Sequence, residues 1–387
     1  MSQPLFAHVA IIGLGQMGAS LGLALKAGDR VAHISGYDLH SDHSATALSF
    51  EAIDHLAATA ADAVQGADLI ILCTPVGTYG AIMEAIAPHL KAGAVLTDIG
   101  SIKSQAIREI TPHLPAGVVF VPSHPVAGSE KVGPYHAHAQ FFARHLFLIC
   151  PTDELDDALV ERIGQLWQST GARVDVMPAA LHDQLYAYMS HLPQLMAFAA
   201  MPVLDEAGMR HDTDDEHFRR FIRIGRSDPE MWRDVFLQNS SNILQSAESV
   251  KAIILHIRDE LASGATKADA QAPDIAIRNQ LAKAVWPRLL ASSLIVSVTL
   301  MEQQLGMPMA RYAAGGFTDF TCPMTESPEP DMELVSQHAP YILSLLDAYL
   351  AQHQLIVSAM GAHAQDELLS TLAIMQASGK KLIATHH

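Results

Sequence analysis

A glycine-rich turn close to the start of the chain constrains its fold more than any other feature. Residues 8–13 form an apolar run of strand type, the turn Gly13-Leu-Gly-Gln-Met-Gly18 follows at once, and a helical stretch begins directly after it. A second apolar run, residues 31–37, ends in Asp38, twenty residues after Gly18. A strand, a glycine turn that opens a helix, a second strand and a terminal acid together predict a dinucleotide-binding unit.

Each part of this turn has a physical role toward a bound dinucleotide. Gly13 allows the tight turn, Gly15 lets the backbone approach the pyrophosphate, and Gly18 lets the helix pack closely on the strand. Free N–H groups at the helix N-terminus attract the anion. Asp38 is expected to accept a hydrogen bond from the ribose 2′-hydroxyl and to repel a 2′-phosphate, which favours NAD over NADP. The alternative is a glycine-rich turn in another kind of α/β domain.

Composition narrows the classes of partner. The 387 residues include 24 basic and 41 acidic side chains, and the net charge of −17 would repel nucleic acid and anionic membranes. An anionic substrate must therefore be met by locally placed cations. Cys73, Cys150 and Cys322 are widely spaced in apolar surroundings, as expected of reduced core residues in a cytoplasmic protein. We expect no signal peptide, no membrane span and no metal site.

The strand and helix signals change near residue 178. Before it, apolar strands alternate with helical stretches, which predicts a doubly wound Rossmann-type α/β domain over residues 1–178. Beyond it, strand signals vanish, and residues 179–206, 231–261, 277–304 and 334–360 are predicted to form long helices. The expected fold class is therefore an α/β nucleotide-binding domain followed by an all-α region.

An internal repeat accounts for the length of the helical region. With an offset of 99 residues, Phe221 aligns with Phe320 and Ile243 with Ile342, and no gap is needed between them. This alignment predicts two copies of one helical unit, the first at residues 179–262 and the second beginning at residue 277, in a domain that extends to residue 387. Chance similarity between two amphipathic segments is the alternative.

Polar side chains follow the strands of the first domain. Thr74, Ser101, Lys103 and His124 come where apolar strands end, so we expect them to face one crevice at the carboxyl edge of the sheet. His124 lies on an exit loop before a proline, and its imidazole is suited to take a proton from a hydroxyl while hydride leaves the same carbon. The alternatives are a capping or surface histidine at 124 and a helix N-cap at Ser101.

The helical half holds two further polar groups. His191 and Gln194 lie three residues apart in an apolar helix interrupted by proline, where a satisfied core histidine is the simpler interpretation. Arg219, Arg223 and Arg226 would share one face if their segment is helical, and such a cluster is suited to bind a carboxylate. The alternative is a solvated surface that pairs with the acidic run at residues 212–216.

Five motifs in chain order carry a resemblance to a known family. They are Gly13-Leu-Gly-Gln-Met-Gly18, residues 97–103 (TDIGSIK), residues 123–130 (SHPVAGSE), residues 190–193 (SHLP) and residues 223–232 (RIGRSDPEMW). From about residue 8 to 260, the chain resembles the prephenate and arogenate dehydrogenases of tyrosine biosynthesis. The resemblance implies NAD-linked oxidative decarboxylation of a cyclohexadienyl substrate, with a helical half that contacts the substrate and forms the subunit interface.

The resemblance also implies residue roles. His124 corresponds to the catalytic histidine, with Ser101 as its partner near the nicotinamide, His191 to a substrate-site histidine and Arg223 to the carboxylate-binding arginine. The expected contacts to NAD are Gly13, Leu14, Gly15, Gln16, Met17, Gly18, Asp38, Thr74, Pro75 and Ser101. The imidazole at 124 and the guanidinium at 223 are expected to converge beside the nicotinamide.

Two departures from the family pattern bear on the substrate. Gln194 stands where the family motif usually continues with a second histidine, and an amide can hydrogen-bond but not titrate. Glu216 stands where the family tends to have glycine, and its carboxylate could pair with the ammonium group of arogenate, which prephenate lacks. We therefore expect a cyclohexadienyl dehydrogenase that accepts arogenate well, with Gln194 and Glu216 among the substrate contacts.

The second helical copy lacks the first copy's polar residues. Cys322 aligns with Arg223, and His191 has no histidine counterpart, which suggests a structural role for this copy. It is expected to pack on the first copy as an internal pseudo-dimer, with a homodimer as the alternative. The competing functions are another oxidoreductase of the 6-phosphogluconate-dehydrogenase-like type and a non-catalytic nucleotide-binding protein. The sequence does not decide the preference between prephenate and arogenate. It also leaves open the tolerance of NADP, feedback by tyrosine and the oligomeric state.

Overall fold

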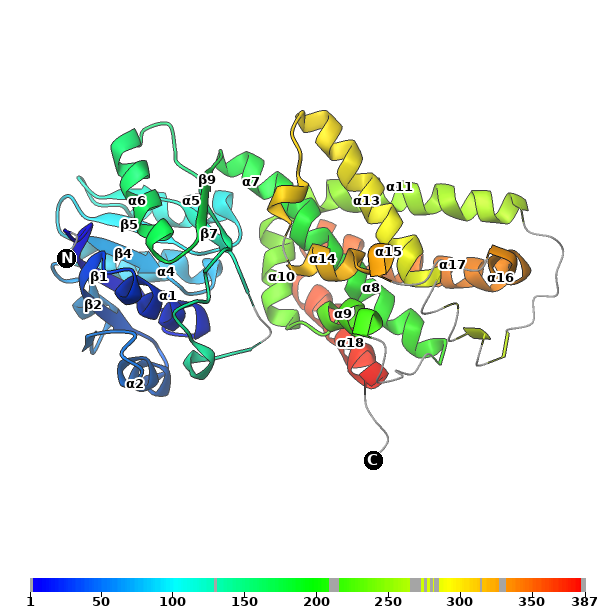
Figure 1. Cartoon of the computed structure of the whole chain (residues 1–387), viewed down its shortest axis with the longest axis horizontal. Coiled ribbons are helices and arrows are strands. Elements are labelled where there is room, and N and C mark those ends of the chain that lie inside the picture. Colours follow the sequence, from blue (N-terminus) through cyan, green and yellow to red (C-terminus); the bar gives the residue numbers. More distant parts are fainter. Residues whose placement is uncertain are drawn as a thin grey trace. The chain divides into compact units, whose positions relative to one another are not determined.

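The computed structural model describes residues 3–128, 131–208, 216–264, 273–274, 277–278, 281, 285–313, 315–326 and 332–383. The chain divides into two compact units, Met1–Asp183 and Gln184–His387. The first is an α/β unit and the second is helical (Figure 1), so the predicted fold class is confirmed. Among the described residues, no helix is long and apolar enough to cross a membrane.

The first unit is built on a parallel sheet of six strands in the order β3-β2-β1-β4-β5-β6. This order reverses between β1 and β4, and in open α/β sheets such a reversal marks the place where ligands bind. The strands are β1 (Phe6–Ile12), β2 (Val31–Tyr37), β3 (His55–Leu56), β4 (Leu69–Leu72), β5 (Val95–Asp98) and β6 (Val119–Val121). The helices are α1 (Gln16–Ala27), α2 (Ser41–Ser49), α3 (Ala60–Val64), α4 (Tyr79–Ile86), α5 (Lys103–Ile110) and α6 (Asp157–Ser169).

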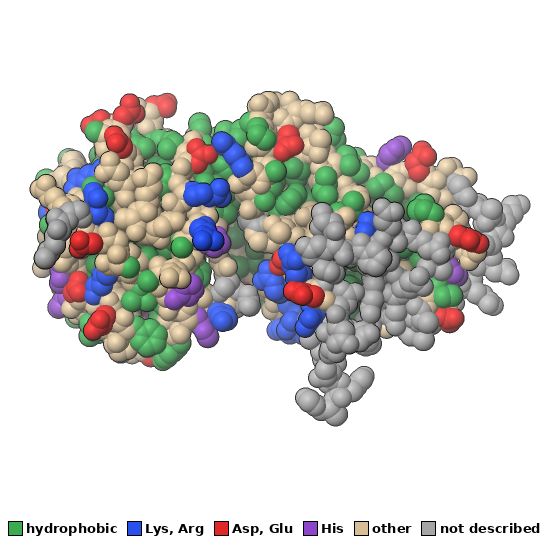
Figure 2. All heavy atoms as spheres, viewed as in Figure 1, with side chains coloured by type: hydrophobic (Ala, Val, Ile, Leu, Met, Phe, Trp, Pro, Cys, Tyr) green, Lys and Arg blue, Asp and Glu red, His purple; other side chains and the backbone are tan. Residues whose placement is uncertain are grey.

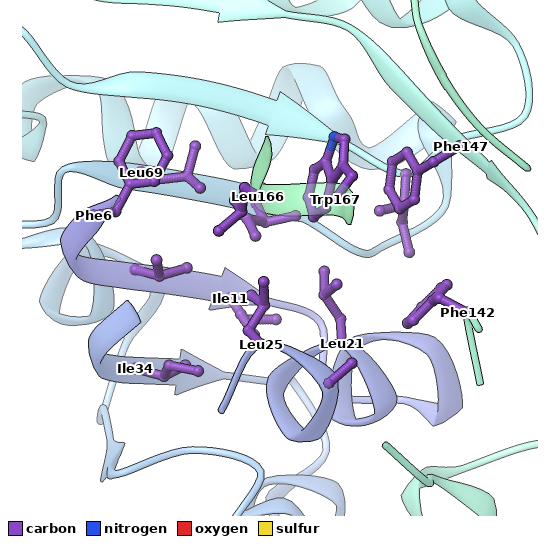
Figure 3. Close-up of a cluster of buried hydrophobic side chains, with 14 of the residues drawn as sticks. Phe6, Ile11, Leu21, Leu25, Ile34, Leu69, Phe142, Phe147, Leu166 and Trp167 are labelled. Carbon is purple, nitrogen blue, oxygen red and sulfur yellow. The ribbon is translucent and has the colours of Figure 1, made fainter. Parts of the chain in front are cut away.

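Two apolar cores cover the two faces of this sheet. Because side chains alternate along a strand, Val9 and Ile11 of β1 face one core while Ala10 and Ile12 face the other. The first core is closed by α1 and α6, and Figure 3 shows Leu25 of α1 beside Ile11 of β1, with Leu21 on the side of Trp167. Helices α3, α4 and α5 close the second core. Burial on both faces explains why β4 is a continuous apolar run.

A smaller sheet follows the main one. Its strands are β7 (Ser123–Val126), β8 (Leu146–Ile149) and β9 (Arg173–Val176), with β7 antiparallel and β9 parallel to β8. The sequence predicted strands at 145–150 and 172–176 in the same doubly wound domain, but they lie in this separate sheet. The chain leaves β6 at Pro122, which has no N–H to donate to a ladder. The sequence predicted His124 on a loop after β6, but His124 lies in β7.

The second unit consists of helices on both sides of residue 270. They are α7 (Ala179–Tyr186, which begins in the first unit), η5 (Ala187–His191), α8 (Leu192–Glu206), α9 (Glu216–Ile224), α10 (Pro229–Gln238), α11 (Ser240–Gly264), α13 (Trp286–Leu305), α14 (Gly315–Thr321), α15 (Pro323–Glu326), α16 (Met332–Gln337), α17 (Ala339–Gly361) and α18 (Gln365–Ile383). Two predicted long helices are each divided in two, at Asn239 and at His338. Helix α18 was not among the predicted helices.

Helices on the two sides of residue 270 pack against one another. Helix α11 packs on α17, α8 on α17, α13 on α11, and α9 on α14. The sequence predicted a helical domain at 179–262 and a second helical copy at 277–387, and the described helices of both segments pack on one another within one compact unit. On the face drawn in Figure 2, hydrophobic, basic, acidic and histidine side chains all reach the surface.

Candidate functional site

The glycine turn has the steric properties that a dinucleotide requires. Gly13 has a φ of +96°, and a Cβ there would lie 2.7 Å from the carbonyl oxygen of Cys73. A Cβ at Gly18 would lie 1.9 Å from the carbonyl oxygen of Gly13, so helix α1 packs directly on the turn. A Cβ at Gly15 would meet nothing within 4 Å. Gly15, which precedes the first residue of α1, therefore faces open space where a pyrophosphate fits.

The carboxylate of Asp38 lies at the end of β2 against this turn. Its Oδ2 accepts a hydrogen bond from the Leu14 N–H at 2.6 Å, and its Oδ1 accepts one from the His40 N–H at 2.8 Å. The side chain is 11% exposed. This placement is suited to an adjacent ribose, and the residues present fit NAD.

The other predicted cofactor contacts surround the turn. Leu14 is buried, which leaves its backbone to contact NAD, and Met17 is partly buried against the first core. The Gln16 side chain donates to the carbonyl oxygen of His136 at 3.5 Å. Thr74 follows β4 and accepts from the Thr78 hydroxyl at 2.9 Å, and Pro75 is exposed. Their contact with NAD stays a prediction.

A buried ion pair lies at the end of β5. Lys103 Nζ is 2.5 Å from Asp98 Oδ2, and neither side chain is exposed. Lys103 Nζ also donates to the Ser123 carbonyl oxygen at 2.6 Å, and the Ser123 N–H donates to Asp98 Oδ1 at 3.0 Å. The expectation that Lys103 faces the crevice is therefore wrong: its ammonium group joins the end of β5 to β7. Ser101, two residues away, is only partly buried.

His124 is the first member of a chain of three hydrogen-bonding groups. Its Nδ1 lies 2.8 Å from His182 Nε2, and His182 Nδ1 lies 2.8 Å from Asp183 Oδ1. Asp183 also accepts from the Lys103 N–H at 2.7 Å and the Ser104 N–H at 2.8 Å, so its carboxylate caps helix α5. The helix begins at Lys103 with Ile102 at its cap position, so the alternative of Ser101 as the N-cap is wrong.

The charges along this chain determine which nitrogens carry protons. Burial alone would raise the pKa of Asp183, but hydrogen bonds from His182, Ser104 and Lys103 hold it below its ordinary value, so the group is a carboxylate. Burial lowers the pKa of His182, which is therefore neutral. Since a carboxylate only accepts, His182 Nδ1 donates to Asp183 and its Nε2 accepts from His124 Nδ1. His124 then carries its lone pair on Nε2, as a general base requires.

In the second unit, His191 ends a π-helical turn. The segment η5 interrupts the helix that the sequence predicted as continuous over residues 179–206, and single π turns in helices occur often at functional sites. His191 is 1% exposed, and its Nδ1 lies 3.1 Å from the Asn239 amide nitrogen. Its ring also meets Trp232 edge-on. This environment suits a satisfied core histidine, and a substrate role for His191 stays a prediction.

Gln194 supports the segment that carries the arginines. Its amide nitrogen donates to the Ile224 carbonyl oxygen at 2.6 Å, and its amide oxygen accepts from the Ser227 hydroxyl at 3.4 Å. Ile224 is the last residue of α9, so this contact satisfies one of the carbonyls that a helix C-terminus leaves without a helical partner. Gln194 is buried, so a direct substrate contact stays a prediction.

Two arginines of α9 bind one carboxylate. Arg223 donates through Nε to Asp319 Oδ2 at 2.9 Å and also through Nη2, while Arg220 Nε lies 3.1 Å from Asp319 Oδ1. The predicted face of Arg219, Arg223 and Arg226 is not formed, because α9 ends at Ile224 before Arg226. Glu216 is exposed at the start of α9. The rest of the acidic run at 212–216 lies outside the described residues.

Four residues of the His124 and Arg223 clusters were not found from the sequence: His182, Asp183, Arg220 and Asp319. The first two follow Pro178 as a His-Asp pair in a new helix, a signal that could have been weighed. Asp319 aligns with Arg220 in the repeat, and this opposite charge was the available signal. None of the three cysteines forms a disulfide bond. Among the described residues, no three His, Cys, Asp or Glu side chains gather as a metal ion requires.

Comparisons with known proteins agree with both units. Residues 21–176 match the family model of the prephenate dehydrogenase nucleotide-binding domain, and residues 178–270 match that of the prephenate dehydrogenase dimerization domain. The chain is 32% identical over 263 residues to a cyclohexadienyl dehydrogenase of Zymomonas mobilis, which covers 67% of this chain and 89% of the relative. A prephenate dehydrogenase of Bacillus subtilis is 29% identical over 61% of this chain and 65% of the relative.

The fold agrees with a solved member of the same family. The structure of prephenate dehydrogenase from A. aeolicus in complex with hydroxyphenyl propionate and NAD+ superposes with a TM-score of 0.60 and 28% identity. It covers 66% of this chain and 91% of that chain. With two family domains in order, a relative above 30% identity and a shared fold, this chain belongs to the prephenate dehydrogenase family.

Proposed function

We propose that this chain catalyses the NAD-dependent oxidative decarboxylation of a cyclohexadienyl substrate, either prephenate to 4-hydroxyphenylpyruvate or arogenate to tyrosine. The observation that carries the proposal is the hydrogen-bonded chain of His124, His182 and Asp183, from which we infer that Nε2 of His124 is the basic nitrogen. This base lies in the same unit as a glycine turn that fits NAD. The names of the relatives support the choice of substrate class.

The protein's own residues orient the substrate and move one proton. His124 Nε2 takes the proton of the ring hydroxyl, which raises the electron density at the carbon that bears it. NAD, when bound, accepts the hydride that leaves this carbon. The ring carboxylate departs as CO2, and the ring becomes aromatic. Arg223 binds a carboxylate of the substrate that would otherwise be buried without a partner.

Steady-state kinetics with prephenate and arogenate, each with NAD and NADP, tests this proposal. We expect NADH formation with at least one substrate, and the His124→Asn variant should lose turnover while it still binds NAD. If neither substrate is oxidised, the proposal is wrong. If His124→Asn keeps normal turnover, a dehydrogenase with a different base would be the better interpretation.

The helix that carries Arg223 also supports the use of arogenate. Glu216 and Arg223 are two helical turns apart on α9 and therefore point to the same side of the helix. We propose that Glu216 pairs with the ammonium group that distinguishes arogenate from prephenate. The Glu216→Gln variant should then lose kcat/KM for arogenate while its kcat/KM for prephenate changes little. A wild-type enzyme with a strong preference for prephenate would contradict this.

We also propose that the helices after residue 270 are a second copy of the first helical unit and occupy the place of a dimer partner. Helices α11 and α17, whose predicted alignment differs by 99 residues, pack on one another. Helix α8 of the first copy packs on α17 of the second, and α13 of the second copy packs on α11 of the first. A two-fold relation between the copies produces such reciprocal pairs. Light scattering at several concentrations should give a monomer. A stable dimer formed through α8 and α11 would contradict this and favour a conventional homodimer.

A further inference from the structure

The second helical copy contributes a residue to the arginine cluster. The match to the dimerization domain ends at residue 270, so α14 lies outside it. Asp319 of α14 nonetheless binds two arginines of α9, Arg220 and Arg223. The side chain of Asp319 is only 13% exposed, whereas that of Arg223 is 41% exposed. The Asp319 carboxylate is thus shielded within the second unit, while the arginine side chain it binds is partly exposed.

The position of Asp319 follows from the repeat. Near a two-fold axis, each residue meets its own counterpart from the other copy. Phe221 and its counterpart Phe320 do so, with ring centroids 5.0 Å apart. Arg220 and Asp319 are also counterparts, separated by 99 residues in the chain. Two identical copies would place arginine against arginine here, and the acidic residue in the second copy turns that repulsion into attraction.

We propose that Asp319 is a positioning residue that fixes the guanidinium group of Arg223 for the substrate carboxylate. The inference rests on the proposed function for the role of Arg223. The divergence of the second copy from the first at this position would then serve catalysis as well as packing. The segment after residue 270 would in this way complete the substrate site of the first copy.

The contacts explain how one carboxylate can orient this arginine. Asp319 Oδ2 accepts from Nε and from Nη2, which lie on one edge of the planar guanidinium group, and this fixes the plane of the group. Asp319 Oδ1 is held in turn by Arg220 Nε. A long arginine side chain that is already ordered loses less rotamer entropy when it binds a ligand. Orientation by Asp319 should therefore lower KM and leave the chemical step unchanged.

A competing interpretation predicts the opposite sign. If Asp319 occupied the position of the substrate carboxylate, it would compete with substrate, and its removal would lower KM. The Arg223 side chain is 41% exposed beside its contact with Asp319, which agrees with a positioning role. The direction of the change in KM therefore separates the two interpretations.

The experiment compares Asp319→Asn with Asp347→Asn in the full chain. Asp347 of α17 binds Arg258 of α11 with a 2.6 Å contact, so it is also an acidic residue of the second copy that pairs with an arginine of the first. We expect Asp319→Asn to raise KM for the cyclohexadienyl substrate about fivefold to tenfold, with kcat within about twofold and KM for NAD unchanged. Asp347→Asn should leave all three constants unchanged, and Asp319→Glu should restore part of the loss.

The outcomes distinguish this inference from the proposed function. An active wild-type enzyme with an unchanged or lower KM in Asp319→Asn refutes the positioning role alone. An active enzyme in which Arg223→Ala leaves KM unchanged also refutes it, because Asp319 then has no substrate-binding group to orient. A wild-type chain that oxidises neither substrate refutes the proposed function instead. Thermal unfolding of both Asp variants controls for a general loss of structure.

Discussion

His124 Nδ1 lies 2.8 Å from His182 Nε2, and the other nitrogen of His182 lies at the same distance from Asp183. The two histidines are 58 residues apart in the chain, one in β7 and the other in α7. With His124 as the proposed base, His182 and the buried carboxylate of Asp183 would set its tautomer as a carboxylate does for the catalytic histidine of hydrolases.

Removal of the His182 acceptor should impair catalysis more than stability. In His182→Leu, His124 Nδ1 loses its partner, and the tautomer with the lone pair on Nε2 is no longer favoured. We expect kcat to fall about 100-fold, by analogy with the loss caused by a wrong tautomer. The acidic limb of the kcat/KM profile should move to lower pH, because the protonated base no longer donates its Nδ1–H to His182 Nε2. His182→Gln, which retains an acceptor oxygen, should recover part of the rate.

A variant of another buried histidine is the control for this experiment. His353→Leu changes a fully buried imidazole in the second unit and should leave the pH profile where it is. If His182→Leu only lowered the unfolding temperature and kept both kcat and the pH profile, His182 would be a packing residue.

An alanine at Gly15 should weaken cofactor binding, whereas an alanine at Gly18 should destabilise the fold. A methyl group at Gly15 meets no atom within 4 Å, so Gly15→Ala should leave the unfolding temperature unchanged while KM for NAD rises about tenfold or more. A methyl group at Gly18 would lie 1.9 Å from a backbone oxygen, so Gly18→Ala should destabilise the first unit by about 2 kcal/mol or more. Calorimetry and NAD titration measure both effects. Equal behaviour of the two variants would contradict the assignment.

Features that depend on neighbouring residues were predictable from the sequence. The glycine turn, its strands and Asp38 lie within one local unit, and their spacing predicts their arrangement. The long helices on both sides of residue 270 were also predictable, because their apolar periodicity is a local property of the sequence. The partner of His124 was not, since only the folded chain brings β7 against α7. The position of Lys103 after a strand predicts that it lies near the ligand-binding edge of the sheet. It does not predict whether the side chain points to that edge or into the core.

The inward direction of Lys103 leads to a stability prediction. Its ammonium group and the Asp98 carboxylate are both fully buried, so Lys103→Met leaves a buried charge without its partner. We expect a loss of about 3–5 kcal/mol in the free energy of unfolding. Lys91→Met is the matched control, because its pair with Asp68 is partly exposed and should cost at most about 1 kcal/mol. Urea denaturation of both variants tests this, and similar losses would contradict it.

His353 should make the second unit sensitive to acid. Its side chain is fully buried in α17, neither ring nitrogen has a hydrogen-bond partner within the described part of the chain, and burial lowers its pKa to about 4. The nearby Lys251 lowers this pKa further in the same direction. In the unfolded chain the histidine has an ordinary pKa near 6.5, so between these two values the unfolded state binds more protons than the folded state. Stability is therefore complete above pH 6.5 and falls as the pH decreases toward 4.

The difference between the two pKa values sets the size of this effect at about 3 kcal/mol. His353→Leu removes the titration, so its free energy of unfolding should exceed that of the wild type by a margin that grows as the pH falls from 7 to 4. At pH 7 the variant should already be about 1 kcal/mol more stable, because an imidazole without hydrogen bonds is replaced by an apolar group. Urea denaturation at several pH values measures the margin. A margin that stays constant with pH would show that His353 binds a proton equally well in the folded and unfolded chains.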